Sequence, residues 1–346
     1  MYPPVQKEKF VLRILEEEKQ LYFQTRILFV SFIATVILSI FIIPILRRLK
    51  VGQIERDDGP QSHFKKKGTP TMGGIIIALG IIIGTIGGVI YYSSKEPEVG
   101  FNILPLLFIT IGFGIIGFID DFKKLVLKNT VGLKPSYKMF GLLIVSVLYT
   151  LYLLKGINLG TETFVPFLKS YINISVWLYI PFTIFVMLAT TNAVNLTDGI
   201  DGLSTSVSAI IVTCLTVIAI ILDVKEIVVF GSIIVGSCLG FLIFNLNKAK
   251  VFMGDTGSLL LGGVISAMAL YLQMPLLLLI IAAVPVIETL SVVLQVLYFK
   301  KTGGKRLFKM APLHHHFELS GWKENKVVSV FCILTLILCV IGLYAI

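Results

Sequence analysis

The segment IVVFGSIIVGSCLGFLIF, residues 227–244, carries no charged side chain over 18 consecutive positions. An α-helix of about 20 mostly apolar residues is long enough to cross the hydrocarbon core of a bilayer. Similar apolar segments recur along the whole chain, and we expect ten transmembrane helices: 22–46, 72–92, 102–119, 139–154, 176–191, 203–222, 227–244, 259–272, 275–298 and 327–345. The sequence therefore predicts an all-α integral membrane protein.

The composition agrees with this interpretation. Only 14% of the 346 residues are charged, against about 25% in a typical soluble domain, which excludes an ordinary soluble protein. The longest polar gaps, 47–71 and 299–326, are too short to hold a separate domain. We therefore expect one membrane domain over residues 22–346, preceded by a charged segment at 1–21.

The charges are distributed unevenly between the two sides of the predicted membrane domain. Of 30 Lys and Arg residues, 21 fall in the loops that follow odd-numbered segments, and the same loops hold 10 Asp and Glu residues, so 21 − 10 gives +11. Loops rich in Lys and Arg face the cytoplasm, which predicts cytoplasmic loops at 47–71, 120–138, 192–202, 245–258 and 299–326. Both termini, including residues 1–21, are then extracytoplasmic. The net charge of +10 reflects this topology and does not indicate a nucleic-acid partner.

Four polar clusters lie on the predicted cytoplasmic face. They are Asp120-Asp121, the run from Asn192 to Gly202, Asn245 with Gly254–Ser258, and His314–His316. The five carboxylates among them suit a hard cation such as Mg²⁺, which takes one or two protein carboxylates and leaves its other positions to phosphates and water. The same loops carry many lysines, whose charges suit phosphate groups. Carboxylates for a metal beside cations for phosphates are typical of phosphoryl transfer.

Each cluster also has a purely structural interpretation. The paired aspartates could be a solvated helix end, the Asn/Asp run could form a turn between helices, and Asp255 could cap the eighth segment. Three consecutive histidines cannot all face one point, and they lack the i,i+4 spacing of a helical zinc pair. Glu288 is the one carboxylate placed inside a predicted helix, where we expect structural support ahead of catalysis.

Six motifs, in this order, carry a family resemblance: RDDGPQSH at 56–63, GTPTMGG at 68–74, DDFKK at 120–124, NAVNLTDGIDGL at 192–203, FMGDTGS at 252–258 and APLHHHFE at 311–318. The chain resembles the phospho-N-acetylmuramoyl-pentapeptide-transferase family, within the polyprenyl-phosphate N-acetylhexosamine-1-phosphate transferases. The motifs cover every large predicted cytoplasmic loop.

The resemblance implies an enzyme of the bacterial cytoplasmic membrane whose active site faces the cytoplasm. The implied reaction transfers phospho-MurNAc-pentapeptide from UDP-MurNAc-pentapeptide to undecaprenyl phosphate. Its products are lipid I and UMP, it requires Mg²⁺, and it is the first membrane step of peptidoglycan synthesis. The family also implies a homodimer.

The resemblance further assigns roles to single residues. The implied catalytic residues are Asp120, Asp121, Asp255 and His314, with Asp255 and Asp121 as metal ligands and Asp120 acting on the lipid phosphate. The implied substrate-binding residues are Lys66, Thr71, Lys124, Lys128, Asn195, Asp198, Gly199, Asp201, Asn245, Phe252, Gln295 and His315.

Two mechanisms fit these residues. Either the lipid phosphate attacks the β-phosphorus directly, or an aspartate first forms a covalent phospho-sugar intermediate. A phosphate monoester is largely ionised near pH 7, since its second pKa is about 6, so it needs little activation and direct attack is favoured. A transporter would place more ionisable groups near the bilayer midplane, and the AspGly-x-x-AlaArg signature of the CDP-alcohol phosphotransferases is absent, since residues 198–203 read DGIDGL.

Overall fold

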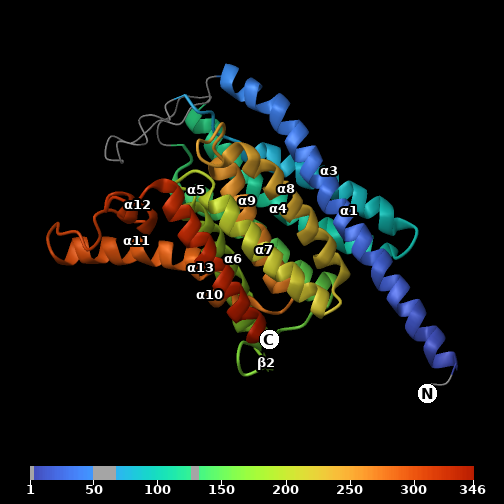
Figure 1. The fold of residues 1–346 in the computed structure, drawn as a ribbon. Coiled ribbons are helices and arrows are strands. Elements are labelled where there is room, and N and C mark those ends of the chain that lie inside the picture. The colour runs from blue at the N-terminus through green and yellow to red at the C-terminus, as the bar shows by residue number, and fades with distance from the viewer. Residues whose placement is uncertain (1–3, 50–67, 126–131) are drawn as a thin grey trace.

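The computed structural model describes residues 4–49, 68–125 and 132–346, with side chains from residue 22 onward. Its elements, in chain order, are α1 (Pro4–Arg48), α3 (Gly74–Ser93), α4 (Pro97–Leu125), α5 (Pro135–Leu151), the π-helical turn η1 (Tyr152–Gly156), β1 (Glu162–Val165), β2 (Ser170–Asn173), α6 (Val176–Thr197), α7 (Leu203–Ile221), α8 (Lys225–Asn245), α9 (Gly254–Tyr271), the 3₁₀ turn η2 (Pro275–Leu277), α10 (Leu278–Ile281), α11 (Ala283–Lys301), α12 (Leu313–Glu318) and α13 (Glu324–Tyr344). Figure 1 shows the long helices gathered into one bundle.

Within the described ranges, nine helices are long and apolar enough to cross a membrane. They are α1 from Tyr22 onward, α3, α4, α5 extended through η1, α6, α7, α8, α11 and α13. The predicted all-α membrane protein is thereby confirmed. Helices α1, α4 and α13 expose many apolar side chains to the surroundings, as expected where lipid replaces water.

The expected span at 259–272 differs from the others. This segment is helix α9, and every residue from Thr256 to Tyr271 is buried. Helix α9 is therefore a central helix surrounded by protein, with α3, α4, α6 and α7 packed around it. Its leucines pack against protein on all sides, and α9 is not one of the nine candidate spans among the described residues.

The expected single span at 275–298 is broken in the structure. Helix α10 ends at Ile281, and α11 begins at Ala283 after a break at Ala282. Pro285 explains the break, because proline donates no backbone N–H and its ring clashes with the carbonyl of the residue four positions earlier, here Ile281. Helix α11 leaves the bundle sideways as a result (Figure 1) and carries the loop that leads to α12.

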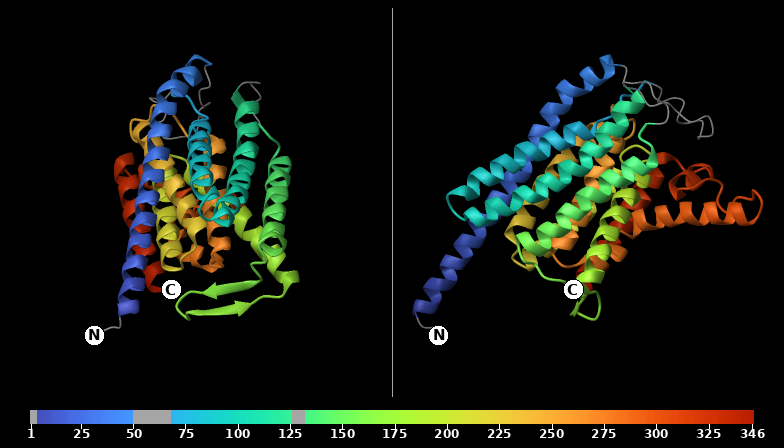
Figure 2. Two further views of the ribbon diagram at one scale, coloured as in Figure 1. Left: turned by 90° about the vertical axis from the view of Figure 1, so that its right-hand side faces the viewer. Right: turned by 180° about the vertical axis from the view of Figure 1, so that it is seen from behind.

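A β-hairpin that was not predicted joins α5 to α6. Strand β1 pairs antiparallel with β2, with Thr163 opposite Ile172. Two backbone hydrogen bonds fix the hairpin to the bundle: Phe164 N–H donates to Gln273 O at 2.8 Å, and Phe167 N–H donates to Ala345 O at 2.9 Å. The hairpin, the start of α1 and the end of α13 lie at the same end of the bundle (Figure 2).

Candidate active site

Three aspartates meet where α4 ends and α9 begins. Asp120, Asp121 and Asp255 each offer a carboxylate oxygen, and these oxygens lie within 4.8 Å of one another. Asp120 is 2% exposed and Asp121 is 5% exposed. Buried carboxylates are costly unless they are paired or hydrogen-bonded, so the partners of each one decide what the cluster can do.

Asp121 acts on the first turn of α9. Its Oδ1 accepts the N–H of Asp255 at 3.2 Å, and its Oδ2 accepts the N–H of Thr256 at 2.9 Å and the Thr256 hydroxyl at 2.6 Å. These N–H groups have no partner within the helix. The two helices approach closely because residue 117 is glycine: a Cβ on Gly117 would lie 2.1 Å from the carbonyl oxygen of Asp255. The position of Asp255 is therefore fixed by α4.

Asp255 is surrounded by cationic and amide groups. Its Oδ2 lies 3.1 Å from Lys124 Nζ and 3.0 Å from Lys138 Nζ, and its Oδ1 accepts Asn195 Nδ2–H at 2.9 Å. Burial raises the pKa of the Asp255 carboxyl, but a hydrogen bond with Asp120 and the charges of both lysines lower it more, so that the pKa lies below its usual range. Asp255 is therefore an anion at neutral pH.

Asp120 is held by two groups of its own. Its Oδ1 accepts the backbone N–H of Leu133 at 2.7 Å, and its Oδ2 forms an ion pair with Lys124. Lys124 thus bridges Asp120 and Asp255, and the three form one network at the end of α4.

Lys138 is the site residue that the sequence analysis missed. It lies in the first turn of α5, which begins at Pro135, and its contact with Asp255 spans 117 positions of the chain. The available signal was its place in the lysine-rich stretch 120–138, where nothing separated it from the other lysines.

The cluster suits a hard divalent cation. The ammonium groups of Lys124 and Lys138 both lie close to Oδ2 of Asp255, which shows that this position attracts positive charge. Mg²⁺ prefers carboxylate oxygens and keeps its remaining positions for water and phosphates. A donor set made only of oxygens fits this ion, whereas zinc prefers nitrogen and sulfur ligands.

The loop after α6 supplies the next group of predicted residues. Asp198 follows the last turn of α6, and burial, followed by the negative charges of Asp255 and Asp121, raises the pKa of its carboxyl to about 8. Gly199 lies against the His314 ring, since a Cβ there would be 2.0 Å from Nε2.

Asp201 is used to hold loops together. Its backbone N–H donates to Glu324 Oε1 at 2.7 Å, and its Oδ2 accepts the N–H of Ala249 at 3.0 Å. It joins the loop after α6 to the loop before α9 and to the start of α13.

Asn245 and Gln295 are also occupied by the chain's own groups. Asn245 is 3% exposed, and its amide bonds to the Thr205 hydroxyl and to Val251 O, both at 3.0 Å. The amide of Gln295 bonds to the backbone of Leu307 and Phe308. Both residues therefore organise the loops around the site.

The remaining predicted residues are distributed around the cluster. Thr71 is buried beside Gly254, the backbone of Phe252 pairs with Pro70 and Gly73, and His315 Nδ1 lies 3.0 Å from Glu318 Oε2. Lys66 and Lys128 lie outside the described residues.

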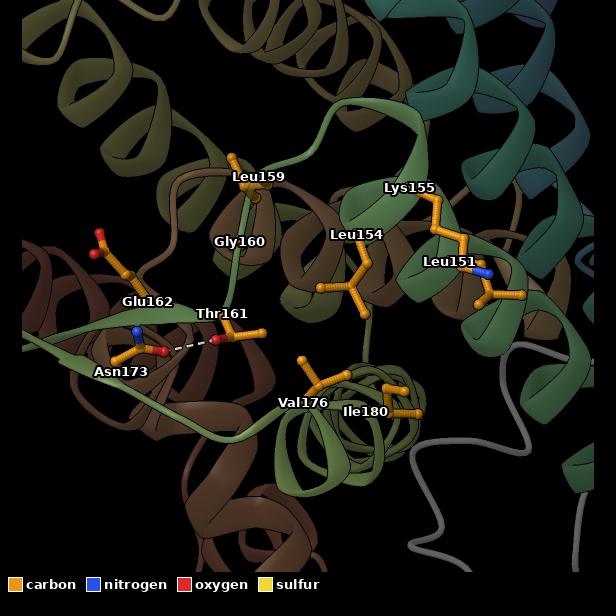
Figure 3. Close-up of a pocket in the computed structure, with 10 residues that line it drawn as sticks. All are labelled: Leu151, Leu154, Lys155, Leu159, Gly160, Thr161, Glu162, Asn173, Val176 and Ile180. Atoms are coloured by element: carbon orange, nitrogen blue, oxygen red, sulfur yellow. Dashed lines mark hydrogen bonds between the residues drawn. The ribbon is translucent and has the colours of Figure 1, made fainter.

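A pocket of about 580 Å³ lies at the opposite end of α5 and α6, beside the hairpin. Leu151, Leu154, Val176 and Ile180 form its apolar wall, and Lys155 lies at its edge (Figure 3). No carboxylate of the aspartate cluster lines it. The pocket is therefore separate from the candidate active site.

Comparisons with known proteins agree on one family. The sequence model of glycosyl transferase family 4 matches residues 103–273. The phospho-N-acetylmuramoyl-pentapeptide-transferase of Acetivibrio thermocellus is 49% identical over 317 residues, which cover 91% of this chain and 93% of the relative. The proteins of the same name from Halalkalibacterium halodurans and Caldicellulosiruptor bescii are each 48% identical, over 92% and 91% of this chain and 95% and 94% of their own length.

Proposed function

Because this chain belongs to the phospho-N-acetylmuramoyl-pentapeptide-transferase family, we propose that it transfers phospho-MurNAc-pentapeptide from UDP-MurNAc-pentapeptide to undecaprenyl phosphate. Lipid I and UMP are the products. The observation that carries this proposal is the aspartate cluster at the ends of α4 and α9, with Lys124 and Lys138 against Asp255. This arrangement joins the anions that hold a metal to the cations that hold a diphosphate.

Mg²⁺ is the metal we propose for this site. Asp255 would hold it together with Asp121, and the bound ion would neutralise charge on the diphosphate of the nucleotide substrate. The side chain of Asp255 is the more accessible of the two, and Asp121 already fixes the backbone at residues 255 and 256. Asp255 is therefore the principal ligand in this proposal.

Asp120 is proposed to act on the acceptor. Its carboxylate is fixed by Leu133 N–H and Lys124, so it can orient the phosphate of undecaprenyl phosphate or take a proton from it. Lys124 and Lys138 would bind phosphate oxygens and favour the transition state, in which charge spreads over them. The lipid phosphate then attacks the β-phosphorus directly, the P–O bond to UMP breaks, and UMP leaves with the electron pair.

The residues after α6 are proposed to bind the nucleotide and sugar. Asp198, Gly199 and Asn195 lie between the cluster and His314, and Phe252 and Thr71 flank the start of α9. Lys66, Lys128, Asp201, Asn245, Gln295 and His315 complete the predicted lining. We propose that the site faces the cytoplasmic side of the bacterial inner membrane, with both termini outside, and the positive charge of these loops supports this orientation. The family resemblance is the ground on which we propose a homodimer.

The activity is tested with purified protein, UDP-MurNAc-pentapeptide, undecaprenyl phosphate and Mg²⁺, following UMP release. We expect UMP only when both substrates are present. Folded protein that releases no UMP from the complete mixture would overturn the proposal.

Direct attack is tested separately, by exchange of labelled UMP into UDP-MurNAc-pentapeptide in a preparation freed of lipid acceptor. Direct attack predicts no exchange. Exchange under these conditions would show that the sugar phosphate passes through a covalent intermediate on the protein.

A further inference from the structure

Helix α11 carries a buried carboxylate that the proposed mechanism does not use. Glu288 is 1% exposed and lies in the apolar segment after the break at Ala282. A carboxylate in such surroundings is costly and marks function unless its partners explain it. Within the part of the chain that the structure describes, the partners of this carboxylate all belong to α12, the helix that carries the three histidines.

Both oxygens of Glu288 bind the start of α12. Oε2 accepts the N–H of Leu313 at 2.6 Å, and Oε1 accepts the N–H of His314 at 3.1 Å. These are first-turn N–H groups, which have no acceptor within the helix. Glu288 therefore holds α12 at a fixed position against α11.

The same carboxylate also faces the side chain of His314. Its Oε1 lies 3.3 Å from Nδ1, and the side chains of both residues are only 1% exposed. Neither ring nitrogen of His314 has a hydrogen-bond partner among the described residues, although both are buried. With solvent excluded, the Glu288 carboxylate is an acceptor that an Nδ1–H of a neutral imidazole can reach by a small rotation of the ring. The hydrogen bond made by one ring nitrogen decides which nitrogen carries the proton.

The other ring nitrogen faces the loop of the candidate active site. A Cβ on Gly199 would lie 2.0 Å from Nε2 of His314, so the ring fits there only because residue 199 is glycine. With the proton on Nδ1, the lone pair of Nε2 points at the loop that begins with Asp198. Glu288, His314 and Gly199 thus form one continuous chain of contacts.

We propose that Glu288 is a positioning residue that fixes the orientation and the Nδ1–H tautomer of His314, so that Nε2 is the free basic nitrogen at the nucleotide loop. This rests on the proposed function for its effect on turnover. It differs from a simple helix cap, because the effect of Glu288 on catalysis passes through the His314 ring.

A double-mutant cycle separates positioning from capping, with UMP release as the readout. Glu288→Gln should lower kcat by about 10- to 100-fold, the range typical when the partner that orients a metal-ligating histidine is lost, and should change KM by less than about twofold. In a His314→Ala background, Glu288→Gln should change kcat by less than about twofold, because the ring is already absent. Glu288→Asp, which keeps the charge, should recover part of the loss.

The contrary result is equally specific. His314→Ala retains the N–H of residue 314, so a residue that only capped α12 would still be needed. A full additional loss from Glu288→Gln in that background would overturn the proposal. Thr289→Val is the matched control, since among the described residues the Thr289 hydroxyl bonds only to Pro285 O within α11, and it should leave kcat unchanged.

A second measurement does not depend on turnover. In protein labelled with ¹⁵N-histidine, the His314 signals are identified by their loss in His314→Gln. We expect protonated Nδ1 and unprotonated Nε2 in the wild type, and loss of that preference in Glu288→Gln, whose amide NH₂ can donate to Nδ1. A wild-type Nε2–H tautomer would overturn the proposal even if the proposed transferase activity is correct. An inactive protein with the expected tautomer would instead contradict the proposed function and support the assigned role of Glu288.

Discussion

Helices α5 and α6 have one end in the aspartate cluster and the other at the hairpin pocket, and the two ends are built differently. At the first end, Lys138 of α5 and Asn195 of α6 both bond to Asp255. At the other end, Leu151 and Ile180 line an apolar pocket beside Lys155. The hairpin there is fixed to the bundle by backbone hydrogen bonds, whereas the cluster is fixed by charged side chains.

The two ends differ in the electrostatic free energy that folding has to offset. Burying several like charges destabilises a fold unless counter-charges and hydrogen bonds offset the cost. At the cluster, the chain supplies those partners from α4, α5, α6 and α9. The hairpin shows that two parts of the bundle can be connected by backbone hydrogen bonds without buried charges. The buried carboxylates of the cluster therefore fit a catalytic role better than a purely structural one.

The largest expected difference between the two ends is in their response to metal. Chelation of Mg²⁺ should abolish UMP release, and added Mg²⁺ should restore it. Mg²⁺ should also raise the melting temperature of the wild type, since a ligand at 100 times its Kd stabilises a protein by about 2.7 kcal/mol. The shift should disappear in Asp255→Asn and persist in Lys155→Met, as measured by thermal unfolding in detergent.

The next difference compares the same substitution at both ends. Lys138→Met removes a charge 3.0 Å from Asp255 Oδ2, and we expect kcat/KM for UMP release to fall by about 100-fold, the scale of a lost transition-state contact. Lys155→Met at the pocket should change it by less than about twofold. Equal effects of the two substitutions would remove the distinction between the ends.

A smaller effect concerns pH. Burial and neighbouring negative charge raise the pKa of Asp198 from 3.8 in the unfolded chain to about 8, so the folded state binds this proton more tightly. The stability that it contributes is complete below about pH 4 and is lost as the pH rises through about 8. The melting temperature of metal-free protein should therefore fall between pH 5 and pH 9, and the slope should be shallower in Asp198→Asn. Parallel slopes would contradict this account of Asp198.

The smallest effect is expected from filling the pocket. Ile180→Phe adds volume to the apolar wall at the hairpin end, and UMP release should change by less than about twofold. Binding of either substrate should also be unaffected. A tenfold loss of kcat in a protein of unchanged melting temperature would show that the two ends are coupled.

Much of the fold follows from local sequence. Apolar length alone identified the candidate membrane spans, because a bilayer requires about 20 such residues in each helix. The burial of α9 did not follow, since Leu259, Leu260 and Leu261 suit contact with protein as well as contact with lipid. A proline inside an apolar segment, such as Pro285, predicts a kink, but its sequence position does not show that α11 leaves the bundle.

The candidate site also contains residues that the sequence predicts and residues that only the structure reveals. Asp120, Asp121 and Asp255 stand out because carboxylates at the ends of apolar segments are conspicuous, and the structure brings them together. Lys138 was missed because its partner is 117 positions away, and one lysine among many carries no local signal. The sequence also did not show that Asp201, Asn245 and Gln295 hydrogen-bond to the chain's own loops. Hydrogen bonds between loops depend on the assembled fold.

The central claim is that the aspartate end of the bundle performs phosphoryl transfer, and Asp255 tests it most directly. UMP release is measured for wild type and Asp255→Asn at saturating substrates and Mg²⁺, with thermal unfolding as the control for folding. We predict a loss of kcat of at least about 1,000-fold, since metal and oxyanion contacts supply several kcal/mol to such reactions. A folded Asp255→Asn protein that retains a third or more of wild-type activity would contradict the account.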